Sequence, residues 1–248
     1  MYIEDPLKMI IYSPPGHGKT TFLGTAAGDD RVSPMLLLEF EAGTKAIQSK
    51  IRKLKLEELG VVPPDVNLID VVSIKTWADF DAAYDFLANY DHQYRSAALD
   101  SLSEMNYLNM AESLSQALRE DKRHDPDIME QRDYLRSASK MRKLVRFFRD
   151  LPLHTFFTAH AGALKDPTSR ELKAWPSLTG KLAFEVPALV DVVGYLAVAE
   201  EEPGGSSKRW LFVQPTPRFY AKDRTEGGKL GPYVEEPTLP GILDLIEV

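Results

Sequence analysis

The chain has 248 residues, of which 44% are apolar and 27% charged, which is the composition of an ordinary globular protein. It contains no cysteine, so disulfides and thiolate metal sites are excluded. The absence of disulfides is compatible with a reducing cytoplasm. The formal net charge of −7 excludes binding of nucleic acid by overall attraction, so any such binding requires local basic patches.

Short apolar runs alternate with helix-like stretches along the chain. No run approaches the roughly 18 residues of a membrane span, and no signal-like segment opens the chain, so we expect a cytoplasmic protein with no membrane partner. The predicted strands are 8–12, 35–40, 66–74, 96–100 and 154–160, followed by a hairpin of 190–199 and 209–215 around "EEEPGGSSK". The predicted helices are 20–27, 44–59, 77–90, 103–119 and 128–149, and a polar loop covers 161–181.

This order of elements predicts the fold class. Alternating strands and helices followed by a hairpin indicate an α/β fold with a mainly parallel sheet flanked by helices and antiparallel strands near the C-terminus. No linker-like composition divides the chain, so we expect a single domain over residues 1–248.

The stretch "IIYSPPGHGKTTF" (10–22) is similar to a phosphate-binding loop, or Walker A motif, between a strand and a helix. The usual pattern is Gly, four residues, Gly, Lys, then Ser or Thr, and here Ser13 stands in place of the first Gly. Glycines allow the backbone to curl around phosphates, whose oxygens accept from its N–H groups. The residues expected to bind a nucleotide are Ser13, Pro14, Pro15, Gly16, His17, Gly18, Lys19, Thr20 and Thr21.

Two side chains are expected to hold Mg²⁺. Thr20 places a hydroxyl next to the phosphates, and Asp100 ends a predicted strand in "AALDSLSE", where such loops need a second oxygen ligand. The alternative for Asp100 is a cap on the helix that follows.

Hydrolysis also requires a group that orients or deprotonates water. "LLLEFEAGTK" offers Glu39 and Glu41, which period two puts on the same face of the strand. Glu41 lies beyond the strand end, where it could reach the γ-phosphate, and the alternative is a solvated carboxylate.

Taken in order, the motifs resemble those of RecA-type ATPases over about residues 8–225. More narrowly, the chain looks like the small phage-encoded ATPases with a RecA core that are linked to single-strand DNA recombination, and "PSLTGKLAFEVPALVDVVGYL" is typical of that group. The matching features are "GKTT", Glu41, "LDSLSE" with Asp100, His160 at the end of "FFTAH", and Lys222 and Arg224 in "FYAKDR".

The resemblance implies a RecA-like P-loop NTPase core with ATP and Mg²⁺ as cofactors. It implies that Glu41 and Lys19 are catalytic, that His160 senses the γ-phosphate where RecA has an amide, and that Lys222 and Arg224 reach a neighbouring subunit's nucleotide. The partners would be a homo-oligomer, as ring or filament, single-stranded DNA and a single-strand-binding protein, in a bacterial host cell. The alternatives are a hydrogen-bonded strand-end histidine for His160 and a solvated hairpin edge for the two cations.

The resemblance also implies that the loop after His160 faces DNA. Basic groups neutralise phosphates and an aromatic ring stacks on an exposed base. The candidates are Lys165, Arg170, Lys173, Trp175 and Lys181. The alternative is a surface hairpin with a packed Trp. The resemblance gives a second candidate DNA-facing loop at 118–125, with Arg119, Lys122 and Arg123, where four acidic residues in and beside the loop dilute the positive charge. Two other basic segments, at 44–59 and 128–149, are more readily explained as solvated surfaces.

The leading interpretation is a Mg²⁺-dependent ATPase that binds single-stranded DNA in recombination or annealing. A RecA-core helicase or motor uses the same parts, and a replisome or packaging adaptor would bind nucleotide without catalysis. A P-loop small-molecule kinase needs a lid with several arginines, whereas "KDPTSRELK" has one.

The motif predicts that substitutions at its first residue, Ser13, and at Lys19 have different effects on ATP binding. Ser13→Gly should leave ATP binding largely intact, because only the first residue of the loop departs from the pattern. Lys19→Ala should abolish measurable binding, because the ammonium reaches the β- and γ-phosphates. Titration calorimetry with ATP checks both variants, and a large loss in Ser13→Gly would contradict the assignment.

Overall fold

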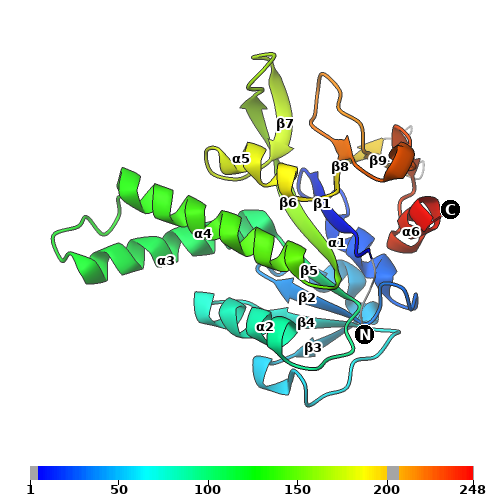
Figure 1. Cartoon of the computed structure of the whole chain (residues 1–248), viewed down its shortest axis with the longest axis horizontal. Coiled ribbons are helices and arrows are strands. Elements are labelled where there is room, and N and C mark those ends of the chain that lie inside the picture. Colours follow the sequence, from blue (N-terminus) through cyan, green and yellow to red (C-terminus); the bar gives the residue numbers. More distant parts are fainter. Residues whose placement is uncertain (1–4, 200–206, 248) are drawn as a thin grey trace.

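The computed structural model describes residues 5–199 and 207–247, which alternate between strands and helices (Figure 1). The strands are β1 (Lys8–Ser13), β2 (Met35–Glu39), β3 (Ile51–Leu54), β4 (Ile69–Ser73), β5 (Ser96–Asp100), β6 (His154–Lys165), β7 (Leu172–Pro176), β8 (Val192–Ala199), β9 (Lys208–Phe212), β10 (Lys222–Asp223) and β11 (Tyr233–Glu235). The helices are α1 (Lys19–Leu23), α2 (Trp77–Asn89), α3 (Leu102–Glu120), α4 (Gln131–Asp150), α5 (Leu182–Glu185) and α6 (Leu239–Glu247). The short 3-10 helices are η1 (Gly24–Ala26), η2 (Thr44–Lys50), η3 (Leu56–Glu58), η4 (Pro187–Leu189) and η5 (Glu226–Gly228).

The strands form a sheet whose central part is parallel. Its order is β11-β9-β8-β1-β6-β5-β2-β4-β3, and every neighbouring pair from β8 to β3 is parallel. Strands β9 and β10 pair antiparallel with β8, and β11 pairs antiparallel with β9. The predicted fold class is therefore confirmed, as is the hairpin, whose turn at 200–206 lies outside the described residues.

Side chains that alternate along β1 supply two hydrophobic layers. Ile10 and Tyr12 face the layer built with α2, α3 and α4, whereas Met9 and Ile11 face the layer built with α1 and α6. Helices on both faces bury the strands, so polar side chains gather where the parallel strands end. No helix in the described ranges is long and apolar enough to cross a membrane.

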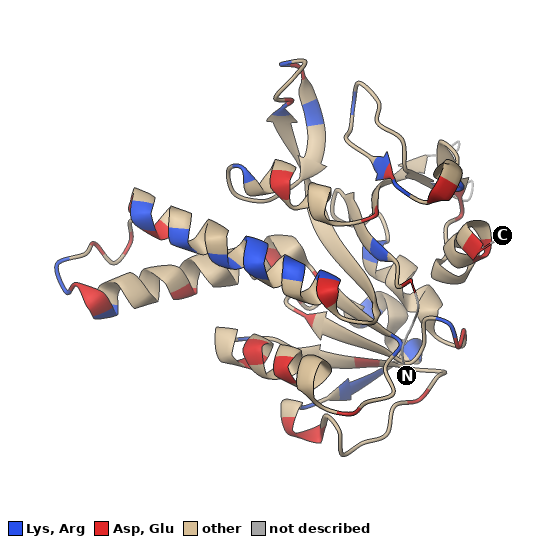
Figure 2. Ribbon diagram, in the orientation of Figure 1, with Lys and Arg blue, Asp and Glu red and all other residues tan. Residues whose placement is uncertain are grey.

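Helices α3 and α4 form a long pair that extends away from the sheet (Figure 1). The apolar side of α4 is buried as predicted through Met141, Leu144, Val145 and Phe148. Tyr134, near the far end, is 43% exposed, because the pair has left the sheet there. The basic side of α4 is visible in Figure 2. Three of its cations contact other side chains of the chain. Arg136 pairs with Glu120 at 3.0 Å, the Lys140 ammonium lies 3.9 Å from the centre of the Trp77 ring, and the Lys143 ammonium lies 5.2 Å from the centre of the Phe147 ring.

Two predicted elements were wrong. The segment 44–59 is η2, β3 and η3 instead of one helix, because residues 51–54 pair in parallel with β4 at the sheet edge. The segment 161–181 is not simply a polar loop, because β6 continues to Lys165 and pairs antiparallel with β7. In both cases pairing with a distant or following strand outweighed local sequence preference.

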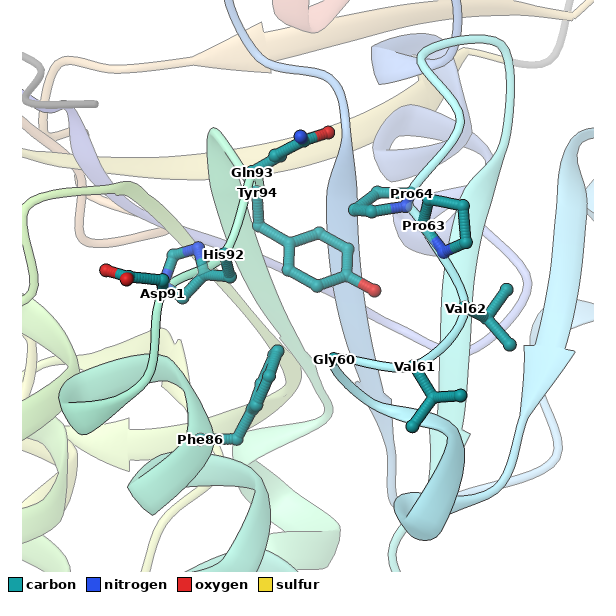
Figure 3. Close-up of a pocket in the computed structure, with 10 residues that line it drawn as sticks. All are labelled: Gly60, Val61, Val62, Pro63, Pro64, Phe86, Asp91, His92, Gln93 and Tyr94. Carbon is teal, nitrogen blue, oxygen red and sulfur yellow. The ribbon is translucent and has the colours of Figure 1, made fainter.

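A cavity of about 190 Å³ lies between the connection from β3 to β4 and the end of α2 with the segment that follows it, and it includes no residue of the phosphate loop. Figure 3 shows the rings of Phe86 and Tyr94 at this cavity, with Pro63 across from them. The Tyr94 hydroxyl donates to Asp70 at 2.8 Å, and the same carboxylate accepts from Arg52 at 2.7 and 2.9 Å. The polar groups behind this wall are thus satisfied by one another, and their role is structural.

Asp70→Ala should destabilise the fold without touching the phosphate loop. The substitution leaves the Tyr94 hydroxyl and the Arg52 guanidinium without their acceptor, at a cost of about 2–4 kcal/mol in the free energy of unfolding. Denaturant unfolding checks this, with the exposed Asp85→Ala of α2 as the matched carboxylate removal. Equal stability of the two variants would contradict the assigned role of Asp70.

Candidate functional site

The phosphate loop lies between β1 and α1, as its motif predicts. Gly16 and Gly18 have φ of +81° and +94°, which residues with a side chain rarely adopt. Ser13 ends β1, is fully buried and has a negative φ, so glycine is not required at its position. The departure from the motif therefore falls on a residue whose backbone is that of the strand.

The Lys19 side chain folds back over this loop. Its ammonium donates to the carbonyl oxygens of Ser13 and Pro14, each at 3.3 Å. Burial lowers the pKa of Lys19, while the nearby carboxylates of Asp100 and Glu41 oppose that shift. A buried ammonium with main-chain partners is suited to exchange them for phosphate oxygens.

Asp100 joins three elements at the carboxyl end of the sheet. Its Oδ2 accepts from the Thr20 hydroxyl at 2.7 Å, and its Oδ1 accepts from the Thr158 hydroxyl of β6. The side chain is buried, and burial raises its pKa against the opposing effect of the two hydroxyls. Thr158 was missed in the sequence, although it stands two residues before His160 and so shares its face of the strand.

These oxygens fit a Mg²⁺ site. Mg²⁺ prefers hard oxygen ligands and usually takes one or two carboxylates together with substrate phosphates. Thr20 and Asp100 supply a hydroxyl and a carboxylate within hydrogen-bond distance of each other, beside the loop expected to hold the phosphates. The desolvated carboxylate also lacks a full counter-charge, which a divalent cation would provide.

Glu41 and His160 meet beside the phosphate loop. The Glu41 Oε2 and His160 Nε2 atoms are 3.5 Å apart, and both side chains are partly exposed. Glu104, in the first turn of α3, completes a cluster whose ligand atoms lie within 4.8 Å of one another. Glu104 was missed in the sequence, although it lies one turn beyond Asp100 in "LDSLSE". A carboxylate beside an imidazole can orient a water molecule and exchange a proton with it.

Glu39 has a different role from Glu41. Its carboxylate is buried and accepts from the hydroxyls of Thr44 at 2.7 Å and Ser73 at 3.0 Å. Of the two glutamates in the sequence motif, only Glu41 lies beyond the strand and faces the loop. Glu41 therefore lies at the cavity, and its catalytic role stays a prediction.

A cavity of about 290 Å³ brings these groups together. It is lined by Pro15, Gly16, Gly18, Lys19, Thr20, Thr21, Glu41, Gly43, Ala46 and His160. Ser13, Pro14 and His17 are therefore the predicted loop residues that do not line it. The cavity combines phosphate-binding amides, an ammonium, a carboxylate and an imidazole, which are the groups that a nucleoside triphosphate hydrolase uses.

Lys222 and Arg224 are not part of this cavity. The Lys222 ammonium donates to the carbonyl oxygens of Pro187, at 2.8 Å, and of Val190, and burial lowers its pKa to about 8. Arg224 is exposed. The structure thus engages Lys222 within its own chain and leaves Arg224 as the cation of this pair that a second subunit could meet.

The predicted DNA-facing residues lie on or next to the β6–β7 hairpin, at the top of Figure 2. Lys165, Arg170 and Lys181 are exposed, while Lys173 pairs with Asp166 at 3.4 Å. The expectation for Trp175 was wrong. Its side chain is buried and stacks on Tyr220 with ring centres 4.2 Å apart, so it is not available to stack on a base.

Comparison with known proteins agrees with this arrangement of groups. Residues 5–225 match the AAA domain family, and the chain belongs to that family. It is therefore an AAA-type P-loop ATPase domain. No curated protein matches the chain.

Two solved structures are similar in outline. One is a KaiC-like protein from the hyperthermophilic archaeon Pyrococcus horikoshii, at 12% identity and a TM-score of 0.44, with 93% of this chain and 89% of that chain covered. The other is an ATPase from the type III secretion system of pathogenic bacteria, at 16% identity and a TM-score of 0.44, with 77% and 51% covered.

The geometry predicts different effects for the two glutamates of the cluster. Glu41→Gln should lower the ATP turnover rate by on the order of 10²–10⁴-fold and leave the Kd for ATP nearly unchanged, because the amide cannot accept a proton from water. Glu104→Gln removes a carboxylate from the same cluster and should cost less. Steady-state hydrolysis measures the turnover rate, and equilibrium binding measures the Kd for ATP. Equal losses of turnover in the two variants would contradict a specific role of Glu41 and would indicate that only the total charge of the cluster matters.

Proposed function

We propose that this protein is a Mg²⁺-dependent ATP hydrolase, phage-encoded, that binds single-stranded DNA and acts in homologous recombination or annealing. The observation that carries the DNA part of the proposal is the continuity of β6. One strand runs from Thr158, which contacts Asp100, through His160 to Lys165 on the exposed hairpin. The base of the hairpin is tied to the same residue, because the Ser177 N–H donates to the His160 carbonyl at 2.7 Å.

Each group of the site has a defined task in this proposal. Lys19 and the loop amides hold the phosphates, and Thr20 and Asp100 hold Mg²⁺. When bound, the cation neutralises charge on the β- and γ-phosphate oxygens. Glu41 accepts the proton of the attacking water, and His160 contacts the γ-phosphate.

The β6–β7 hairpin supplies the proposed DNA contacts. Lys165, Arg170 and Lys181 are exposed cations that can neutralise DNA phosphates, and Lys173 contributes if its pairing with Asp166 is exchanged. With Trp175 buried, the contact is mainly electrostatic and therefore strongly dependent on salt. If ATP binding shifts His160, the shift would also move the hairpin, because both belong to β6. This movement would favour DNA binding.

Arg224 is proposed to act on the nucleotide of a neighbouring subunit. A cation supplied in this way stabilises charge on the transferred phosphoryl group and raises the rate by on the order of 10³-fold. Lys222 then orients the segment that carries Arg224 through its bonds to the carbonyls of Pro187 and Val190. This role requires a homo-oligomer.

Single-stranded DNA should stimulate ATP hydrolysis through the hairpin. The double variant Lys165→Ala/Arg170→Ala should lose most of the stimulation and keep the basal rate, because neither residue lines the ATP cavity. Lys55→Ala/Lys75→Ala removes the same charge from exposed positions outside both candidate DNA loops and serves as the control. The measurement is the ATPase rate with and without single-stranded DNA across protein concentration.

Three results would each contradict one part of the proposal. If single-stranded DNA does not stimulate ATP hydrolysis by the wild type, the proposal that the protein binds DNA is wrong. If both double variants are stimulated equally, the proposal that the β6–β7 hairpin makes the DNA contacts is wrong. The proposed action of Arg224 on a neighbouring subunit is wrong if the ATPase rate per subunit does not change with protein concentration and Arg224→Ala hydrolyses ATP at the wild-type rate.

A further inference from the structure

The β8–β9 hairpin brings a cation against the phosphate loop from the side opposite His160. Arg209 lies on β9, and the period of the strand puts its side chain on the same face as Leu211, which packs in the layer covered by α1 and α6. A Cβ placed on Gly18 would be 2.8 Å from the Arg209 Nε and 3.6 Å from its Cζ. The guanidinium therefore lies directly against the backbone of the loop.

This guanidinium is buried in part without an acceptor. Its Nε is shielded from solvent and has no hydrogen-bond partner, and within residues 5–199 and 207–247 no carboxylate forms an ion pair with Arg209. The nearby Glu236 uses Oε1 to accept from the backbone N–H of Arg209 at 2.7 Å. Burying a charged donor without a partner is costly, so an anion at this position would remove the penalty.

The position of Arg209 along the loop indicates which anion it meets. The loop rests on the hairpin at His17, whose Nδ1 is 3.4 Å from the Leu196 carbonyl oxygen, and at Gly18. By strand order, β9 lies on one side of β1 while β6, with His160, lies on the other. Loop amides such as that of Gly18 cradle the α- and β-phosphates, whereas Lys19 reaches the β- and γ-phosphates.

We infer that Arg209 is a nucleotide-binding residue that acts within its own subunit and donates to the α/β-phosphate end of the nucleotide. The inference rests on the ATP binding of the proposed function and adds a second cation to the site besides Lys19. Since the contact is to phosphates that ADP and ATP share, it should contribute to the binding of both nucleotides equally. It is independent of Arg224, which is proposed to act across a subunit boundary.

The test measures the Kd of ADP and of ATP, each with Mg²⁺, for the wild type and for Arg209→Gln and Arg209→Lys. Arg209→Gln should weaken both nucleotides by the same factor, on the order of 10-fold to 100-fold, as expected for a lost hydrogen bond to a charged group. Arg209→Lys keeps the charge and should lose less. Arg218→Ala removes an exposed arginine from another turn and should change neither Kd.

The melting temperature without nucleotide separates binding from folding. The inference is supported if Arg209→Gln keeps the wild-type melting temperature and raises the Kd of ADP and of ATP by the same factor. It is also supported if Arg209→Lys and Arg209→Gln have equal melting temperatures but Arg209→Lys binds both nucleotides more tightly. Unchanged Kd values for Arg209→Gln, or a loss confined to ATP, would overturn it. If wild-type protein binds neither nucleotide, the proposed function fails first, and that result is distinct from a failure of Arg209 alone.

Discussion

The buried carboxylate of Asp100 is the interaction on which the arrangement of the site depends. It accepts from Thr20 at the start of α1 and from Thr158 in β6, so it ties the phosphate loop to β5 and β6, two strands that helices α3 and α4 separate in the chain. The insertion of β6 between β1 and β5 makes this possible. A carboxylate in this desolvated place has a raised pKa, and a cation is the natural compensation.

Charge is distributed unevenly around the loop. Glu41, Glu104 and His160 lie toward the β2–β6 side, while Arg209 lies on the β9 side and Lys19 in the middle. The protein carries a net charge of −7, so affinity for a polyanion has to come from this local concentration of donors. The Lys19 ammonium is held by main-chain carbonyl oxygens and the Arg209 Nε has no acceptor, so both donors are available to an anion.

Much of the fold and of the phosphate site could be predicted because the signals are local. The loop 13–21 needs its glycines at positive φ, and β1, β2 and β5 are continuous apolar runs, as expected for strands buried on both faces. The wrong predictions concern residues whose structure depends on contacts with residues that are distant in the sequence. Residues 51–54 have helix-like basic spacing but pair with β4, and Trp175 looked available in a polar stretch but stacks on Tyr220.

The sequence by itself determined the phosphate loop, the alternation of strands and helices, and the residue types at the strand ends, because each depends on backbone geometry and on periodicity within a few residues. Only the tertiary structure decided which of these side chains meet. Strand order brought Thr158 to Asp100 and Glu104 to His160, engaged Lys222 with carbonyls of its own chain, and set Arg209 against Gly18. Such contacts join residues up to 191 positions apart, and no local pattern encodes a distance across a sheet.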